Sequence, residues 1–210
     1  EGIRTYDYLE DADHAYKAAK AFAQFSGTLC DLPGPPLVET IPGFHDSLKR
    51  LRAFRSAIGE DPFGRAAGVK GEIHFILEES SIFELLAELV ATGQIPIRVV
   101  HNDTKINDIL FDAETDEALC VIDLDTVMPG LTVHDFGDLM RTTTAPADED
   151  ETDLSKVRFE TSHFEAIAAG YLEGAEDFLT EAEIRSLVLG GKVIILEQAM
   201  RFLTDYLQGD

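Results

Sequence analysis

The stretch of sequence that decides the fold reads His101-Asn102-Asp103-Thr104-Lys105-Ile106-Asn107-Asp108. It follows the apolar run Ile97-Arg98-Val99-Val100, which predicts a short strand. After it, the apolar segments 109–111 and 119–122 flank a polar segment, 112–117, and this pattern predicts two strands joined by a turn. We therefore expect the octet to be a polar loop between one strand and a β-hairpin.

Helical periodicity fills most of the remaining chain. Apolar residues recur at helical spacing in six segments, which are 11–30, 44–58, 69–92, 132–141, 153–174 and 180–208. Gly93 is expected to end the third of them, and an acidic loop, 147–153, precedes the fifth. Helices around so small a β element predict an α+β domain that is mainly helical.

The octet matches the pattern H-x-D-x-x-x-x-N of phosphoryl-transfer catalytic loops except at its last position. Phosphoryl transfer needs an Asp that accepts or orients the proton of the acceptor hydroxyl, and Asp103 stands at that position. It also needs a metal ligand a few residues further on, where this chain has Asp108. Lys105 is placed to contact the transferring phosphate. The loop therefore predicts a site that binds Mg²⁺ and phosphate.

A second acidic position supports this prediction. Asp123 ends the predicted hairpin, 20 residues beyond Asp103, where kinases hold a further Mg²⁺ ligand. The sequence Asp135-Phe136-Gly137 resembles the kinase metal motif, but it follows a turn and opens a helix. We expect Asp135 to cap that helix or to hold the catalytic loop by hydrogen bonds, and His101 to brace the same loop.

Composition limits the partners. The 210 residues carry 40 Asp and Glu against 17 Lys and Arg, a net charge of −23. This balance argues against nucleic acid and anionic membranes, and a nucleotide would need a metal cation to bridge the like charges. An acidic cleft would suit a neutral or cationic acceptor. Two cysteines and the lack of an apolar stretch long enough for a bilayer predict reduced thiols and a cytoplasmic location.

The segments 101–112, 121–130 and 134–138 together resemble the aminoglycoside phosphotransferase and choline kinase superfamily, and their wording is most similar to its N-acetylhexosamine 1-kinase-like branch. The resemblance is strong over 101–141 and weaker over the flanking helices. It implies a bilobal kinase-like fold, ATP and Mg²⁺ as co-substrate and cofactor, and phosphorylation of a small metabolite such as an amino sugar. By position, Asp103 is the catalytic base, Asp108 and Asp123 hold the metal, and Arg201 faces the substrate.

Two departures from the family pattern matter. Position 108 is Asp where the family has Asn, which adds a charge near the phosphates. No glycine-rich loop and no strand lysine for the nucleotide lies upstream of Asp103. We therefore expect residues 1–210 to be a C-terminal catalytic lobe without its N-terminal nucleotide lobe, and to have negligible turnover alone.

Alternatives remain at this point. The run Ile122-Asp123-Leu124-Asp125-Thr126-Val127 fits the nucleophile motif of haloacid dehalogenase-type phosphatases, although that fold needs further parallel strands. The lobe is also compatible with a non-catalytic pseudokinase or binding module. Arg201 fits a salt-bridged position as well as a substrate role. The histidines at 14, 45, 74 and 163 lack ligand spacing and fit surface or satisfied core positions.

Overall fold

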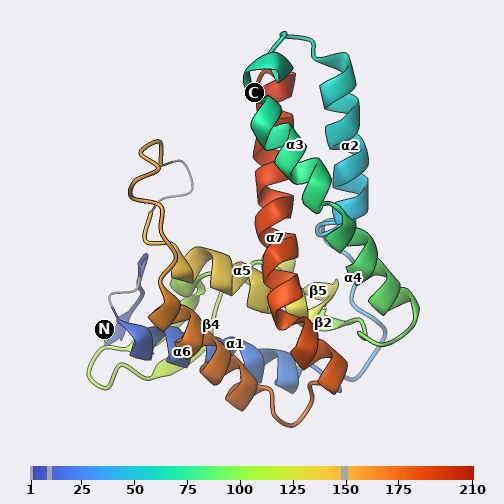
Figure 1. The fold of residues 1–210 in the computed structure, drawn as a ribbon. Coiled ribbons are helices and arrows are strands. Elements are labelled where there is room, and N and C mark those ends of the chain that lie inside the picture. Colours follow the sequence, from blue (N-terminus) through green and yellow to red (C-terminus); the bar gives the residue numbers. More distant parts are fainter. Residues whose placement is uncertain (1, 9–10, 148–150) are drawn as a thin grey trace.

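The computed structural model describes residues 2–8, 11–147 and 151–210. Figure 1 shows a helical base, formed by α1, α5 and α6, from which α2, α3 and the second half of α7 rise as an arm. The helices are α1 (Ala12–Thr28), α2 (Ser47–Glu60), α3 (Lys70–Glu79), α4 (Ser81–Ala91), α5 (Thr132–Thr144), α6 (Thr161–Gly174) and α7 (Glu181–Gln208). The strands are β1 (Ile3–Arg4), β2 (Arg98–Val100), β3 (Ile109–Asp112), β4 (Ala118–Val121) and β5 (Met128–Gly130). The predicted class, α+β and mainly helical, is confirmed.

Two small antiparallel sheets hold the loop 101–108. The predicted hairpin is formed by β3 and β4, which pair Ile109 with Val121. The predicted strand before the loop is β2, and it pairs with β5 so that Val100 lies opposite Met128. Strands β1 and β5 escaped sequence analysis because two or three residues are too few to show an alternating pattern. The loop thus leaves one sheet and enters the other.

Helix α7 runs from the base into the arm (Figure 1). It packs against α5 in its first half and against α2, α3 and α4 along its length, while α1 packs against α6 on the far side of the base (Figure 1). At the crossing of α5 and α7 the two backbones are very close, because a Cβ at Gly190 would lie 2.1 Å from the carbonyl oxygen of Val133. The glycine pair at 190–191 in the middle of a 28-residue helix is therefore explained by packing.

Two helix predictions were wrong in their bounds. Segment 69–92 is two helices, because the helix is interrupted at Ser80, whose hydroxyl donates to the carbonyl of Leu77 at 2.8 Å. Segment 153–174 becomes helical only at Thr161. Before that, Asp153 accepts hydrogen bonds from the amide and the hydroxyl of Ser155, a local arrangement that competes with helix formation. The acidic loop 147–153 lies partly outside the described residues.

Within the described ranges, no helix combines the length and apolar character that a bilayer crossing requires. The two cysteines, Cys30 and Cys120, are both unpaired and exposed.

Candidate active site

The loop 101–108 begins at two buried residues and then emerges. His101 and Asn102 are buried, whereas the side chains of Asp103 and Lys105 are 31% and 40% exposed. Asn102 has φ = 68°, in the left-handed region that asparagine tolerates better than most residues. This backbone conformation turns the chain after β2, and Asp103 is the first side chain of the loop to reach solvent.

The side chain of Asn102 is anchored on the sheet that carries β5. Its amide nitrogen lies 3.0 Å from the carbonyl oxygen of Thr126 and 3.3 Å from that of Met128. Opposite this amide stands Gly130, where a Cβ would lie only 2.3 Å from the Asn102 side-chain oxygen. A residue without a side chain is therefore needed at 130 for the loop to take this conformation.

Asp135 holds the loop from below. Its carboxylate accepts hydrogen bonds from the backbone amides of His101 (3.0 Å) and Asn102 (2.7 Å), and its carbonyl accepts one from the Thr104 hydroxyl at 2.6 Å. Burial raises the pKa of Asp135 to about 6, while the two amides oppose this shift. The N-cap of α5 is Leu131, so of the two expectations for Asp135 the structure has the hydrogen bonds to the loop.

His101 joins the loop to the hairpin. Its Nε2 lies 3.0 Å from the carbonyl oxygen of Ile122, and a carbonyl only accepts, so Nε2 carries the proton. The ring is fully buried and meets Phe22 of α1 edge to face at 5.3 Å between centroids. Because Ile122 directly precedes Asp123, this bond fixes the distance between the loop 101–108 and Asp123.

Asp103 and Lys105 form an ion pair at the surface of the loop. The Lys105 ammonium lies 3.0 Å from an Asp103 carboxylate oxygen. Burial opposes the charged form of Lys105, but the hydrogen bond and charge of Asp103, together with the charge of Asp138, leave its pKa raised. Asp138 itself is buried on α5 and paired with Arg141. The lysine therefore stays protonated beside the carboxylate expected to act as base.

Asp108 is a buried acid that no described residue satisfies. It is 7% exposed, and its carboxylate receives no hydrogen bond from the part of the chain that the structure describes. Burial raises its pKa to about 6, and the negative charges of Asp123 and Asp103 add to the effect. Asp123 is exposed two residues beyond the end of β4, with φ = 58°. The two acids thus lie near enough for the charge of Asp123 to raise the pKa of Asp108.

This arrangement fits a hard cation that is only partly held by protein. Among the described residues, no group of three or more His, Cys, Asp or Glu side chains could enclose a metal. Mg²⁺ is commonly held by one or two carboxylates together with substrate phosphates and water. Asp108 and Asp123 supply carboxylate oxygens of that kind, so the residues present are compatible with Mg²⁺ bound together with a nucleotide.

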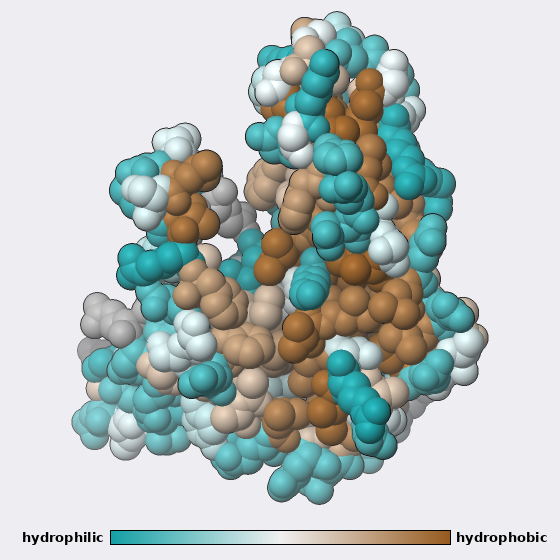
Figure 2. Space-filling view, in the orientation of Figure 1, coloured by the Kyte–Doolittle hydropathy of each residue, from teal (hydrophilic) through white to brown (hydrophobic). Residues whose placement is uncertain are grey.

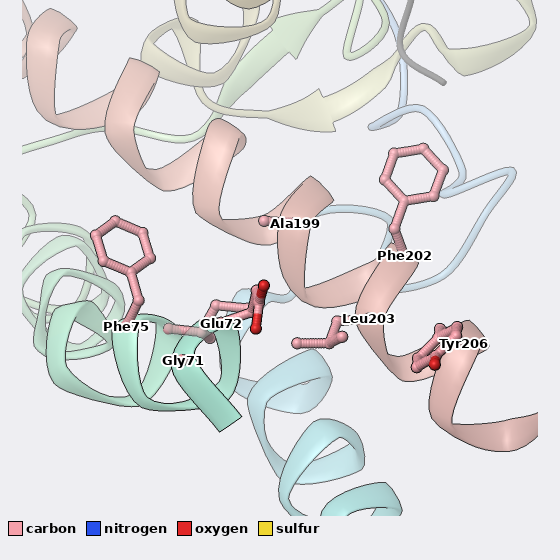
Figure 3. A pocket seen from close by; sticks show the side chains of 8 residues that line it. Gly71, Glu72, Phe75, Ala199, Phe202, Leu203 and Tyr206 are labelled. Carbon is pink, nitrogen blue, oxygen red and sulfur yellow. The ribbon is translucent and has the colours of Figure 1, made fainter. Parts of the chain in front are cut away.

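Arg201 is exposed on α7, and its guanidinium lies over the ring of Phe202 at 4.8 Å. No ion pair to it occurs within the described residues, so the salt-bridged alternative was wrong. A cavity of about 550 Å³ opens nearby between α3 and α7 (Figure 3). Apolar side chains line it and continue over α4 and α7 on the same face (Figure 2). No residue of the loop 101–108 lines this cavity.

Sequence analysis missed two residues of the site, His45 and Glu197. His45 lies between α1 and α2, and its Nε2 is 2.8 Å from the carbonyl oxygen of Asn102. Its Nδ1 is 3.0 Å from the carboxylate of Glu197 on α7. No sequence signal links these two residues to the loop, because both are far from 101–108 along the chain.

The arrangement is that of a phosphotransferase of the kinase-like type, with an anchored H-x-D loop and a hairpin that ends in an acid. All strand pairs among the described residues are antiparallel, which leaves no parallel sheet for the dehalogenase-type alternative. The model of one protein family, described as the phosphotransferase enzyme family, matches residues 2–182. The chain therefore belongs to this family.

Proposed function

We propose that the protein transfers the γ-phosphate of ATP to a hydroxyl group of a small metabolite. The observation that carries this proposal is the pair Asp103–Lys105, 3.0 Å apart, on a loop whose backbone is fixed by Asp135. A carboxylate beside a cation, both partly exposed on a rigid loop, suits proton acceptance next to a phosphate.

The residues divide the work as follows. Asp103 accepts a hydrogen bond from the acceptor hydroxyl and takes its proton as the oxygen attacks phosphorus. Lys105 stands beside it to contact the transferring phosphate. Asp108 and Asp123 would hold Mg²⁺, which neutralises charge on the phosphates when it is bound. Since the chain has few cations, this compensation is a central demand of the proposal.

The acceptor we propose is an amino sugar, with Arg201 on the substrate side. An overall charge of −23 disfavours anionic acceptors and suits neutral or cationic ones. The nucleotide-covering glycine-rich loop and the strand lysine are proposed to come from polypeptide additional to residues 1–210. On this proposal the 210-residue chain alone has negligible turnover.

The first experiment replaces the proposed base in the full-length natural protein. Asp103→Asn should lower kcat by roughly 10²–10⁴-fold, because it removes the proton acceptor, while the thermal unfolding curve stays close to that of the wild type. Asp177→Asn, a substitution of an exposed acid that follows α6, is the matched control and should keep the wild-type rate. A wild-type rate in Asp103→Asn would rule out the proposed role.

Product formation identifies the acceptor. The full-length protein, with ATP and Mg²⁺, is screened against amino sugars, neutral sugars, choline, amino acids and aminoglycosides, and phosphorylated products are detected by mass spectrometry. We expect N-acetylhexosamines to be converted fastest. Binding of a metabolite without any phosphorylated product would favour the non-catalytic binding module instead.

A further inference from the structure

The side chain of His45 lies between the arm and the loop 101–108. Its side chain is 8% exposed, and both ring nitrogens have partners. Nε2 lies 2.8 Å from the carbonyl oxygen of Asn102, and Nδ1 lies 3.0 Å from a carboxylate oxygen of Glu197. His45 therefore links α7 to the residue that directly precedes the proposed base.

Both partners of His45 are acceptors. A backbone carbonyl accepts only, and Glu197 accepts when it is ionised. The Ser47 hydroxyl donates to the second carboxylate oxygen of Glu197, and Arg50 Nε lies 3.3 Å from the first. With acceptors on both sides, each ring nitrogen must carry a proton. Beside a Glu197 carboxylate, this geometry is that of an imidazolium at His45.

The charges around His45 also favour its protonated form. Burial alone lowers the pKa of His45, but the hydrogen bond and charge of Glu197, the Asn102 carbonyl and the charge of Asp138 outweigh burial and leave the pKa raised. The ring of the neighbouring His134 lies 4.9 Å away between centroids, and its pKa is shifted in the opposite direction. Burial and the charge of His45 lower its pKa well below the usual value. The pKa values of the two histidines are therefore shifted apart, with that of His45 the higher.

The bond from His45 has a particular place in the loop. The backbone amide of Asn102 donates to the carboxylate of Asp135. The side-chain amide of Asn102 donates to the carbonyl of Met128 on β5. The peptide group that joins Asn102 to Asp103 has one hydrogen bond within the described residues, and its donor is His45. The orientation of this peptide plane sets the direction in which Asp103 leaves the backbone. Removing this hydrogen bond would let the Asn102–Asp103 peptide rotate, although Asn102 itself stays anchored.

We propose that His45 is a positioning residue, which in its protonated form fixes the Asn102–Asp103 peptide and so places Asp103 for phosphoryl transfer. The inference rests on the proposed function, and it adds that the loop is tied to the arm through Glu197 on α7 and Arg50 on α2. Turnover should therefore depend on the protonation of His45. The rate should be full below the pKa of His45 and should decline as the pH rises through that pKa.

The test uses the full-length protein and three variants. His45→Gln keeps an N–H for the Asn102 carbonyl but turns its oxygen toward Glu197, so kcat should fall by roughly 10²-fold with little change in KM. In the double variant His45→Gln with Glu197→Gln, the two amides complement each other without charge. This variant should recover most of kcat and should lose the alkaline decline that His45 causes. His74→Gln, on the exposed face of α3, is the control and should match the wild type.

Two further measurements do not depend on turnover. In protein labelled with ¹⁵N-histidine, both nitrogens of His45 should show protonated shifts at pH 7, with the signal assigned by its loss in His45→Gln. The backbone amide of Asn102 should exchange with deuterium at least about tenfold faster in His45→Gln than in the wild type, because the loop opens more often.

The outcomes are distinct. A neutral His45 at pH 7 overturns the inference, and so does His45→Gln with wild-type kcat and wild-type amide exchange. If the wild-type protein phosphorylates no acceptor, the proposed function fails. The imidazole shifts and the exchange of Asn102 then decide on their own whether protonated His45 holds the loop.

Discussion

Gly130→Ala tests whether the loop 101–108, which carries the proposed base, depends on the close approach of β5. The new Cβ would lie 2.3 Å from the side-chain oxygen of Asn102 and 2.6 Å from Cγ2 of Val100. Ordinary contacts of a Cβ begin near 3.4 Å. The backbone at Gly130 is outside the left-handed region, so alanine is allowed there and the clash is the only penalty. Asn102 must therefore move by about 1 Å, which is the difference between the 2.3 Å approach and the 3.4 Å of an ordinary contact.

The magnitude follows from the contacts that move. Overpacking a closely packed site costs about 1–3 kcal/mol. Displacing the Asn102 amide weakens its hydrogen bonds to Thr126 and Met128, which adds about 1 kcal/mol. We expect the free energy of unfolding to fall by about 2–4 kcal/mol in total. Because Asn102 precedes Asp103, a shift of this size should also lower kcat by roughly 10²-fold.

Urea denaturation followed by circular dichroism measures the stability, and a coupled ATPase-type assay of the full-length protein measures kcat. Gly59→Ala in α2 is the matched control, since no atom lies within 4 Å of its added Cβ. It should be neutral or stabilising by up to about 1 kcal/mol. The loss caused by Gly130→Ala should shrink when Asn102→Gly is already present. Wild-type stability and rate in Gly130→Ala, or full additivity with Asn102→Gly, would refute this reasoning.

Two further predictions concern buried acids. In metal-free protein, the pKa of Asp108 is raised from 3.8 to about 6. The stability that protonation of Asp108 contributes to the fold is therefore fully present below about pH 4, and it is lost as the pH rises through 6. Asp108→Asn should therefore be more stable than the wild type by about 2–3 kcal/mol at pH 8 and equal to it at pH 4. Identical pH dependence in both proteins, measured by urea titration, would contradict this. Glu183 is fully buried and accepts two hydrogen bonds from Arg98 and one from Thr132. Glu183→Ala should lower the free energy of unfolding by about 3–5 kcal/mol, because it leaves Arg98 without its charge partner. Glu181→Ala, which breaks an exposed ion pair, should change it by less than about 1 kcal/mol, and equal losses in the two variants would show the reasoning to be wrong.

The β-hairpin and most of the helices followed from the sequence because their signals are local. The pairing of Ile109 with Val121 is set by two apolar runs and a short turn between them. The same locality explains the two errors. A break at Ser80 and a non-helical start of segment 153–174 depend on side-chain hydrogen bonds that compete with the helix. Apolar periodicity does not record such competition.

The sequence by itself determined the octet 101–108, the distance along the chain to Asp123, and the excess of acidic over basic residues. These are properties of contiguous residues or of composition, so no fold is needed to read them. The tertiary structure decided which distant residues hold the octet. Asp135 binds it from α5, Gly130 makes room for Asn102, and His45 joins it to Glu197, a residue 152 positions away in the chain. Such contacts depend on how α2, α5 and α7 pack around the loop, and packing between distant segments leaves no periodic mark in the sequence.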